Sequence, residues 1–388
     1  MLTTERASAV DVHIRQAAFS DYDQIAAVMA RNGLTPRPRA SWIALWRGNP
    51  AFDPAAQAPV AWVLEAENRL AGCVAGVPRN YVFGGERIRA IAECDWAVDK
   101  RYRSYALALW QRLARRNDVE LLLSTTVSAA SEPAYSAYHW SRAPVGQWDQ
   151  AGFWVTGYGG FLRSALRRRE VPLAAGLAYP LGAALWCRDR LLYDGEDRSL
   201  TMAARKIFTS RDAAARKKRC AVEWRADFDS GFDLFWQDLQ QEKKDVLLAA
   251  RDAATLAWHY QPGQARQNAW IVTASQGSRL RAYAIFVRRD QQRLGLRRMR
   301  LADFQALEEG AEAFQAILDR AIARCKAEGI HMLEDVGCFS DRLGFPAPHR
   351  RKLEAWAFYY KALSAGLIGT LADPARCDPT AFEGDLSL

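Results

Sequence analysis

A six-residue stretch from Arg103 to Ala108 (RSYALA) combines a permanent positive charge, a hydroxyl group and small side chains. It follows an apolar segment that ends at Val98 and leads into a run of strong helix formers. The first turn of a helix offers unpaired backbone N–H groups and the positive end of the helix dipole, which together attract anions. Small side chains would let a phosphate approach those N–H groups, while Arg103 and Ser104 add a charge and a hydroxyl donor. The pattern predicts a diphosphate site or, alternatively, an ordinary helix start whose small residues pack on a sheet.

Two carboxylates lie shortly before this stretch, in the run AIAECDWAV at 90–98. Glu93 and Asp95 are two residues apart, so in a regular strand they would share one face. An acid in the middle of a central strand costs free energy unless it is paired or takes part in chemistry. Both carboxylates are therefore candidates for proton transfer. An ion pair with a nearby arginine is the alternative, which we favour for Asp95.

The elements that would position these groups follow from hydrophobic periodicity and turn residues. Up to about residue 150 the expected order is β-α-α-β-β-β-α-β-α. Strands are expected at 12–17, 61–67, 71–78, within 81–98 around a Gly-Gly turn, and at 119–127, and helices at 19–33, 40–50, 103–115 and 132–140. Glu93 and Asp95 thus fall on the strand before the Arg103 helix.

After residue 220 the expected order is helices, three strands, a helix, a strand and a helix, which resembles the order of the first half without a direct sequence repeat. Before this second half, the charge-free stretch at 171–187 predicts a helix buried between domains or, alternatively, peripheral membrane contact through 167–187. The last element of this second half is a helix expected at 350–363. We divide the chain into a first domain at 1–162, a helical linker at 163–220, a second domain at 221–370 and a surface tail at 371–388.

The stretch from Val98 to Ala108 resembles the acetyl-coenzyme A signature of the Gcn5-related N-acetyltransferase (GNAT) superfamily. In that signature a Val ends the fourth strand, and Arg-x-x-Gly-x-Gly/Ala opens the following helix. Here Ala106 stands at the first Gly position, and Ala108 is an allowed variant of the second. The family's downstream pattern, Asn-x-x-Ala-x-x-x-Tyr-x-x-x-Gly-Phe, is matched in position by Ser128, Ser131, Tyr135, His139 and Trp140, with only the Tyr retained. The resemblance covers about 12–150, and the second half lacks the signature, so we expect it to have lost coenzyme binding.

The resemblance implies an α/β (α+β) fold of two GNAT-like domains, each a mixed, mainly antiparallel sheet flanked by helices, joined by a helical linker. It implies an enzyme that uses acetyl-CoA or another acyl-CoA as co-substrate, without a metal. The acyl group would pass to an amine by direct attack in a ternary complex. The coenzyme would be bound by Val98, Arg103, Ser104, Tyr105, Ala106, Leu107 and Ala108. The Val98 backbone amide would polarise the thioester carbonyl.

Such a reaction needs a base, because an amine with a pKa of ~10 is mostly protonated at pH 7, and a proton donor for the departing thiolate. We assign Glu93 as the base and Tyr135 as the acid, since a phenol can both donate and accept a proton. Tyr138 is the fallback acid and His139 an alternative base. For the two tyrosines, a role as core aromatics is the competing interpretation.

Composition restricts the partners and the compartment. The net charge of +9 favours anionic partners, but nucleic acid is not expected, because basic and aromatic residues do not interleave. The seven cysteines form no CxxC pair, so neither disulfides nor a zinc site are expected, and reduced thiols point to the cytoplasm. The acceptor is expected to be an amine on a small molecule, an amino acid or a sugar precursor. It would lie between the two halves, near Trp258, Tyr260, Arg297 and Arg298.

Two other functions remain open. A FemAB-type aminoacyl or peptidyl transferase also pairs two GNAT-like halves and would use aminoacyl-tRNA, which would explain the basic charge. The retained signature in the first half argues against it. A non-catalytic GNAT-like binding module is the third alternative, with Ala106 and Ser128 marking decay of an ancestral site.

Overall fold

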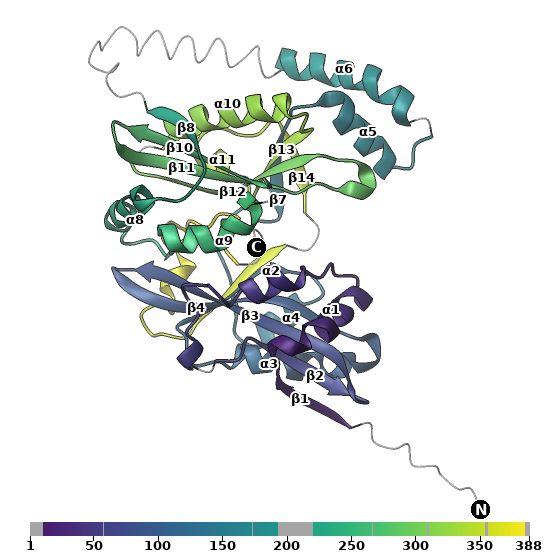
Figure 1. Cartoon of the computed structure of the whole chain (residues 1–388), viewed down its shortest axis with the longest axis vertical. Helices are drawn as coiled ribbons and strands as arrows, with labels where there is room; N and C mark the ends of the chain where they lie inside the picture. Colours follow the sequence, from purple (N-terminus) through teal and green to yellow (C-terminus); the bar gives the residue numbers. More distant parts are fainter. Residues whose placement is uncertain are drawn as a thin grey trace, which may run out of the picture.

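The computed structural model describes residues 11–56, 58–172, 174–192, 220–265, 267–308, 310–353 and 356–384. The described residues form two β-sheets stacked along the long axis of the molecule, with helices around and between them (Figure 1). Of the predicted linker at 163–220, residues 173 and 193–219 lie outside the described residues, as do the last four residues of the predicted tail.

The first sheet has the order β1-β2-β3-β4-β5-β15-β6, with the short β9 paired to β3. Its strands are β1 (Val12–Gln16), β2 (Ala61–Ala66), β3 (Arg69–Phe83), β4 (Glu86–Val98), β5 (Leu121–Val127), β6 (Ser141–Arg142), β9 (Leu248–Ala249) and β15 (Ala357–Ala362). Helices α1 (Tyr22–Arg31) and α2 (Arg39–Ala44) pack on one face. Helices α3 (Ala106–Ala114) and α4 (Glu132–Ala137) pack on the other. The element order predicted for residues 12–140 is confirmed.

Helix α3 lies close to the sheet because of a glycine on β3. A Cβ atom on Gly76 would come within 2.7 Å of Leu113 on α3 and of Ile91 on β4. Glycine leaves this space to the two aliphatic side chains, which belong to the buried cluster under α3. The close packing fixes the height of α3 above β4, the strand that carries the candidate acids.

The second sheet has the order β14-β7-β13-β12-β11-β10-β8. Its strands are β7 (Gln150–Val155), β8 (Ala221–Arg225), β10 (Ala269–Gln276), β11 (Arg279–Arg288), β12 (Arg298–Ala306), β13 (Met332–Val336) and β14 (His349–Lys352). Helix α10 (Ala311–Ala327) covers the outer face, and the short α11 (Phe339–Arg342) follows β13. Helices α8 (Ser230–Glu242) and α9 (Ala253–Ala265) lie between the two sheets (Figure 1). One buried cluster joins α8 and α9 to both sheets, so the two halves share a core.

The two sheets exchange strands. β7 lies within the segment that we expected to form the first domain, yet it pairs with β13 and β14 of the second sheet. β15 lies within the expected second domain, yet it pairs with β5 of the first sheet. Neither sheet is therefore built from one continuous stretch of the chain.

The final helix expected at 350–363 is wrong, because this segment forms β14 and β15. Along β15, Phe358 and Tyr360 point into the core between the sheets, while Ala357 and Tyr359 point into the core under α3 and α4. A strand buried on both faces reads as a continuous apolar run, which periodicity alone does not distinguish from a buried helix. Its aromatic residues favour a strand.

The expected surface tail is wrong for the residues that the structure describes. Phe382 is fully buried, and Thr380 and Glu383 are nearly so. At Gly384 a Cβ atom would come within 2.3 Å of the Thr125 hydroxyl on β5. The described C-terminal segment, up to Gly384, therefore lies between the two halves and reaches β5 of the first sheet (Figure 1).

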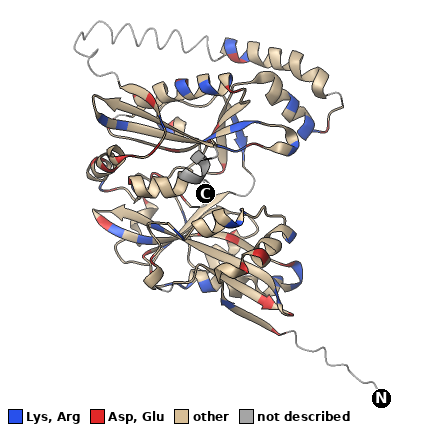
Figure 2. Ribbon diagram, viewed as in Figure 1, with Lys and Arg blue, Asp and Glu red and all other residues tan. Residues whose placement is uncertain are grey.

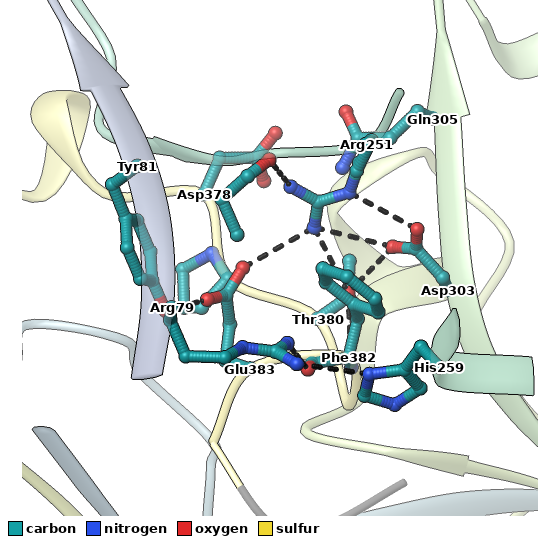
Figure 3. Close-up of polar contacts among 12 residues, drawn as sticks. Arg79, Tyr81, Arg251, His259, Asp303, Gln305, Asp378, Thr380, Phe382 and Glu383 are labelled. Carbon is teal, nitrogen blue, oxygen red and sulfur yellow. Dashed lines mark hydrogen bonds and ion pairs between the residues drawn. The ribbon is translucent and has the colours of Figure 1, made fainter. Parts of the chain in front are cut away.

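A buried polar network holds the C-terminal segment in place (Figure 3). Arg251 donates to the Asp303 carboxylate at 3.0 Å and to the Glu383 carboxylate at 3.2 Å. Tyr81 on β3 donates to the same Glu383 carboxylate. Arg79 donates to the Phe382 carbonyl oxygen at 2.7 Å. Groups from the first half, the second half and the C-terminal segment are thus linked away from water.

We expect His259, which lies at the edge of this network, to make the fold acid-sensitive. Burial, reinforced by the charge of Arg79 at 2.9 Å, holds the pKa of His259 well below its usual 6.5. As pH falls below 6.5, the unfolded chain binds a proton that the folded chain does not, so stability is lost. Unfolding in urea at pH 7 and pH 5 measures this loss. His259→Gln should reduce it, while His139→Gln, at an exposed position, should keep the wild-type difference; equal pH dependence in all three proteins would contradict the account.

Helix α6 (Ala174–Leu192) packs against α5 (Tyr158–Arg168) at the outer side of the second sheet (Figure 1). Among the described residues it carries six large exposed hydrophobic side chains: Leu177, Tyr179, Leu181, Trp186, Leu191 and Leu192. The expectation of a buried interdomain helix here is therefore wrong. No helix in the described part of the chain is both long enough and apolar enough to cross a bilayer. Membrane contact through 167–187 stays a prediction.

Candidate active site

Strands β4 and β5 pair only at one end. They are parallel and in register from Ala90↔Leu121 to Ala92↔Leu123. Beyond this point β4 continues to Val98 and β5 to Val127 without further pairing between them, while β5 stays paired with β15 on its other side. The first sheet therefore splays open from residue 93 onward, and β4 presents an open edge there.

The backbone of Val98 faces this open edge. Val98 is the last residue of β4 and lies opposite Gly72 of β3. The next amide, Asp99 N–H, donates to the Ala71 carbonyl oxygen on β3 at 2.8 Å. Because successive amides of an extended strand point in opposite directions, the Val98 N–H is directed away from β3. It is placed where it could donate to a group held between β4 and β5.

Glu93 and Tyr135 meet at the start of the splay. The Tyr135 hydroxyl donates to the Glu93 carboxylate, at 2.8 Å from both oxygens, and Trp110 Nε1–H donates to it at 2.9 Å. Glu93 is 6% exposed and Tyr135 is 1% exposed. Ser124 on β5 lies 3.1 Å from the Tyr135 hydroxyl. The structure thus joins the two residues that we assigned to proton transfer, although they are 42 positions apart.

The electrostatics of this pair keep the phenol protonated. Burial raises the pKa of Tyr135 above its usual value of 10, and the nearby Glu93 carboxylate raises it further. Trp110 and Tyr135 are surrounded by other rings, with Trp96 stacked on Trp110 at 5.8 Å and Tyr359 5.3 Å from Tyr135. The Tyr135 hydroxyl therefore keeps its proton beside the Glu93 carboxyl group.

Asp95 lies on the opposite face of β4, so the expectation that it shares a face with Glu93 is wrong. The register with β3 jumps from Ala75↔Cys94 to Cys73↔Ala97, which marks a β-bulge on β4. Asp95 adopts a φ of 55°, a left-handed conformation that is uncommon for residues other than glycine. The bulge turns its carboxylate toward Arg37 at 2.9 Å and Trp42 at 3.2 Å. The ion pair that we favoured for Asp95 is confirmed.

The segment after Val98 differs from the expected helix start. Lys100–Tyr105 forms a 3-10 helix, η3, which runs directly into α3 at Ala106. The Ala106 N–H donates to the Arg103 carbonyl oxygen, and no side chain, that of Ser104 included, caps α3. Amides that we expected to receive a phosphate are thus used inside helical turns. Arg103, Ser104, Tyr105, Leu107 and Ala108 are exposed, and Ala106 is half-buried.

No protein-family model matches the sequence, and no curated protein sequence matches it. Solved structures do. A GCN5-related N-acetyltransferase from Anabaena variabilis has a TM-score of 0.52 at 12% identity, over 91% of this chain and 73% of that chain. A second, from Kribbella flavida, has a TM-score of 0.53 at 9% identity, over 92% and 72%. Saccharomyces cerevisiae N-myristoyltransferase with bound myristoyl-CoA has a TM-score of 0.51 at 9% identity, over 93% and 81%.

The chain has the fold of two GNAT-like domains. At these identities the likeness establishes the fold, and the resemblance stated from the sequence is confirmed at that level. The splayed β4 and β5 belong to the first GNAT-like domain. The corresponding parallel pair of the second is β12 and β13.

Three other residues matched to the GNAT downstream pattern, and the fallback acid Tyr138, lie around α4. Ser128 and Ser131 lie with their hydroxyls 2.9 Å apart before α4, and Tyr138 bonds Gln111 on α3. His139 has a φ of 58° and is exposed at the end of the α4 segment. Tyr138, the fallback acid, therefore lies on the same side of the sheet as Tyr135, with its hydroxyl already engaged by Gln111.

The residues expected to line an acceptor site between the GNAT-like domains do not form one group. Trp258 donates to the Ala44 carbonyl oxygen at 2.6 Å and so ties α9 to the end of α2. Tyr260 is buried in the shared core. Arg297 contacts His331, while Arg298 lines a separate cavity in the second domain. Sequence reasoning missed Arg37, Trp42 and Trp110, because contacts to the acids form only in the folded chain.

Proposed function

We propose that the first GNAT-like domain is an acyl-CoA-dependent N-acyltransferase, with acetyl-CoA as the first candidate donor. The observation that carries this proposal is the open edge of β4, with the Val98 amide at its end and the Glu93–Tyr135 pair at its start. The likeness to the fold of N-acetyltransferases and of an N-myristoyltransferase with bound myristoyl-CoA supports it. Glu93 and Tyr135 are its proposed catalytic residues.

The open edge of β4 suits the extended, amide-containing arm of coenzyme A. An extended ligand can add to a free strand edge through backbone hydrogen bonds, as peptides do in β-augmentation. The phosphates would then lie near η3, where Lys100 and Arg103 are exposed cations and Ser104 offers a hydroxyl. Side chains of η3, in place of free amides of α3, would supply most of the phosphate contacts. The Val98 N–H would polarise the thioester carbonyl.

Glu93 and Tyr135 form a path for the proton. Glu93 accepts a proton from the attacking amine, Tyr135 gives its proton to the departing sulfur, and Glu93 passes the accepted proton to Tyr135. One proton thus moves from nitrogen to sulfur, and both residues return to their starting states. Their direct hydrogen bond at 2.8 Å is short enough for this transfer. The acceptor is proposed to be an amine on a small molecule, an amino acid or a sugar precursor.

A thiol-release assay tests the proposal. The full chain is incubated with acetyl-CoA or longer acyl-CoAs and with panels of amines, amino acids and amino sugars, and free thiol is measured. We expect release that requires both an acyl-CoA and an amine. Bound coenzyme without release for any amine would favour the non-catalytic module. Co-purification of tRNA without bound coenzyme would favour a FemAB-type transferase.

A further inference from the structure

A large cavity in the second GNAT-like domain is rich in cations, which make up seven of its twelve described lining residues. Its volume is about 700 Å³, within the range of small-molecule sites. It lies where the end of α5, the loop between β11 and β12, and the strands β12 and β14 meet, a region rich in Lys and Arg (Figure 2). Six arginines line it: Arg167, Arg168, Arg293, Arg298, Arg300 and Arg351.

The negative charge around this cavity does not balance the positive charge. Lys352 adds a seventh cation to the lining, and Glu170 is the one acid among the lining residues that the structure describes. Beneath the lining, the fully buried Glu334 carboxylate accepts bonds from three of the arginines, with Arg300 at 3.0 Å. Asp149 also pairs with Lys352 at 4.0 Å, and Asp290 acts on Arg298. Among the described residues, four carboxylates thus accompany the seven cations of the lining. A bound anion would relieve the repulsion that remains.

The pKa directions agree with a shortage of negative charge. Burial lowers the pKa of Arg298, and the neighbouring Arg300 and Arg351 lower it further, although Glu334 acts in the opposite direction. Nearby Arg289 has its pKa lowered to about 10 by burial and then by Arg300 and other guanidiniums. Arg298 and Arg289 are thus held close to other cations and partly away from water, which costs free energy in the absence of an anion.

The arginines of this cavity are held in place by the surrounding structure. Arg300 is 8% exposed, is bonded to Glu334 and lies over the Trp356 ring at 5.6 Å, so its guanidinium is held from two sides. Arg167 and Arg293 are exposed at the rim and approach from different elements. One guanidinium group can donate two parallel hydrogen bonds to two oxygens of the same phosphate. Buried and rim arginines together could contact more than one phosphate.

We propose that this cavity binds a ligand that carries two or more phosphate groups. The proposal concerns the second domain and does not depend on acyl transfer by the first. Two kinds of molecule carry such phosphate groups: soluble oligophosphate compounds and anionic lipids, which carry them in the headgroup. The second kind is relevant because α5, which carries Arg167 and Arg168, packs against α6 with its exposed hydrophobic side chains.

Titration calorimetry of the full chain with inorganic tripolyphosphate tests the soluble source. Co-sedimentation with phosphatidylcholine vesicles, with and without cardiolipin, tests the lipid source. The test variant is Arg167→Glu/Arg293→Glu, which changes only exposed rim residues. The control, Arg115→Glu/Arg320→Glu, makes the same charge change directly after α3 and on α10, outside the cavity.

We expect binding of at least one probe, weakened roughly tenfold or more in the rim variant, which corresponds to about 1.4 kcal/mol. The control variant should bind as the wild type does. Tripolyphosphate binding would assign a soluble ligand, and cardiolipin-dependent sedimentation alone would assign a lipid headgroup. Binding of neither probe, or equal loss in the rim and control variants, would overturn the proposal. Because the readout is binding, its failure is separate from any failure of acyl transfer.

Discussion

Replacing Glu93 with Gln is expected to lower kcat for acyl transfer by roughly 10²–10⁴-fold, the usual contribution of a positioned general base. Gln keeps the length of the side chain and an oxygen that can accept from Tyr135 and Trp110, so folding should be preserved. The affinity for acyl-CoA should be unchanged, because Glu93 lies at the start of the splay and the proposed phosphate contacts lie on η3. Steady-state rates of thiol release, with coenzyme affinity measured in parallel, check both parts.

Glu120→Gln is the matched control for this prediction. Glu120 precedes β5 and forms an ion pair with Arg89 at 3.0 Å at the surface, so its loss should leave kcat as it is. Tyr135→Phe should lower kcat, because it removes the proposed proton donor. Raising the pH should not restore kcat in this variant. A Glu93→Gln protein as active as the wild type would show that the carboxylate only stabilises the fold.

Replacing Arg251 with Met is expected to destabilise the whole chain by about 3–5 kcal/mol, because it leaves buried carboxylates without their cation. Arg251 is 1% exposed and contacts both Asp303 and Glu383. The change should also loosen the C-terminal segment, which Glu383 anchors. Urea unfolding followed by tryptophan fluorescence measures the first effect, and protease cleavage near residue 380 measures the second.

Arg279→Met provides the comparison. Arg279 pairs with Asp238 at 2.7 Å on the surface, where water screens the charges, and its replacement should have little effect on unfolding. If both variants unfold at the wild-type urea concentration, the buried network does not hold the two halves together. If Arg251→Met unfolds early but the C-terminal segment stays protected, the segment is anchored by contacts other than Glu383.

The first GNAT-like domain could be predicted from the sequence because its signals are local. Strands, turns and amphipathic helices between residues 12 and 140 follow one another along the chain, and each has its own periodicity. The exchange of β7 and β15 could not be predicted in this way. Each of these strands pairs with a partner that lies far along the chain, and strand pairing leaves no local pattern. The burial of residues 380–383 depends on both halves and was missed for the same reason.

The candidate site was predicted in part. Glu93 and Tyr135 could be selected by residue type and position, but their contact, and the contribution of Trp110, depend on how α3 and α4 pack on β4. Asp95 was placed on the wrong face, because nothing in the sequence distinguishes a bulged strand from a regular one at this point. The 3-10 turn at η3 was missed because its residues also suit an α-helix.

Calorimetric titration of the full chain with acetyl-CoA tests the central claim, that the open edge of β4 and the adjoining η3 bind an acyl-CoA. The comparison is between Arg103→Glu in η3 and Arg115→Glu directly after α3, which change the charge equally at exposed positions. We expect saturable binding by the wild type and by Arg115→Glu, and loss of binding in Arg103→Glu. No binding of acetyl-CoA or of longer acyl-CoAs by the wild type, or equal binding by all three proteins, would contradict the claim.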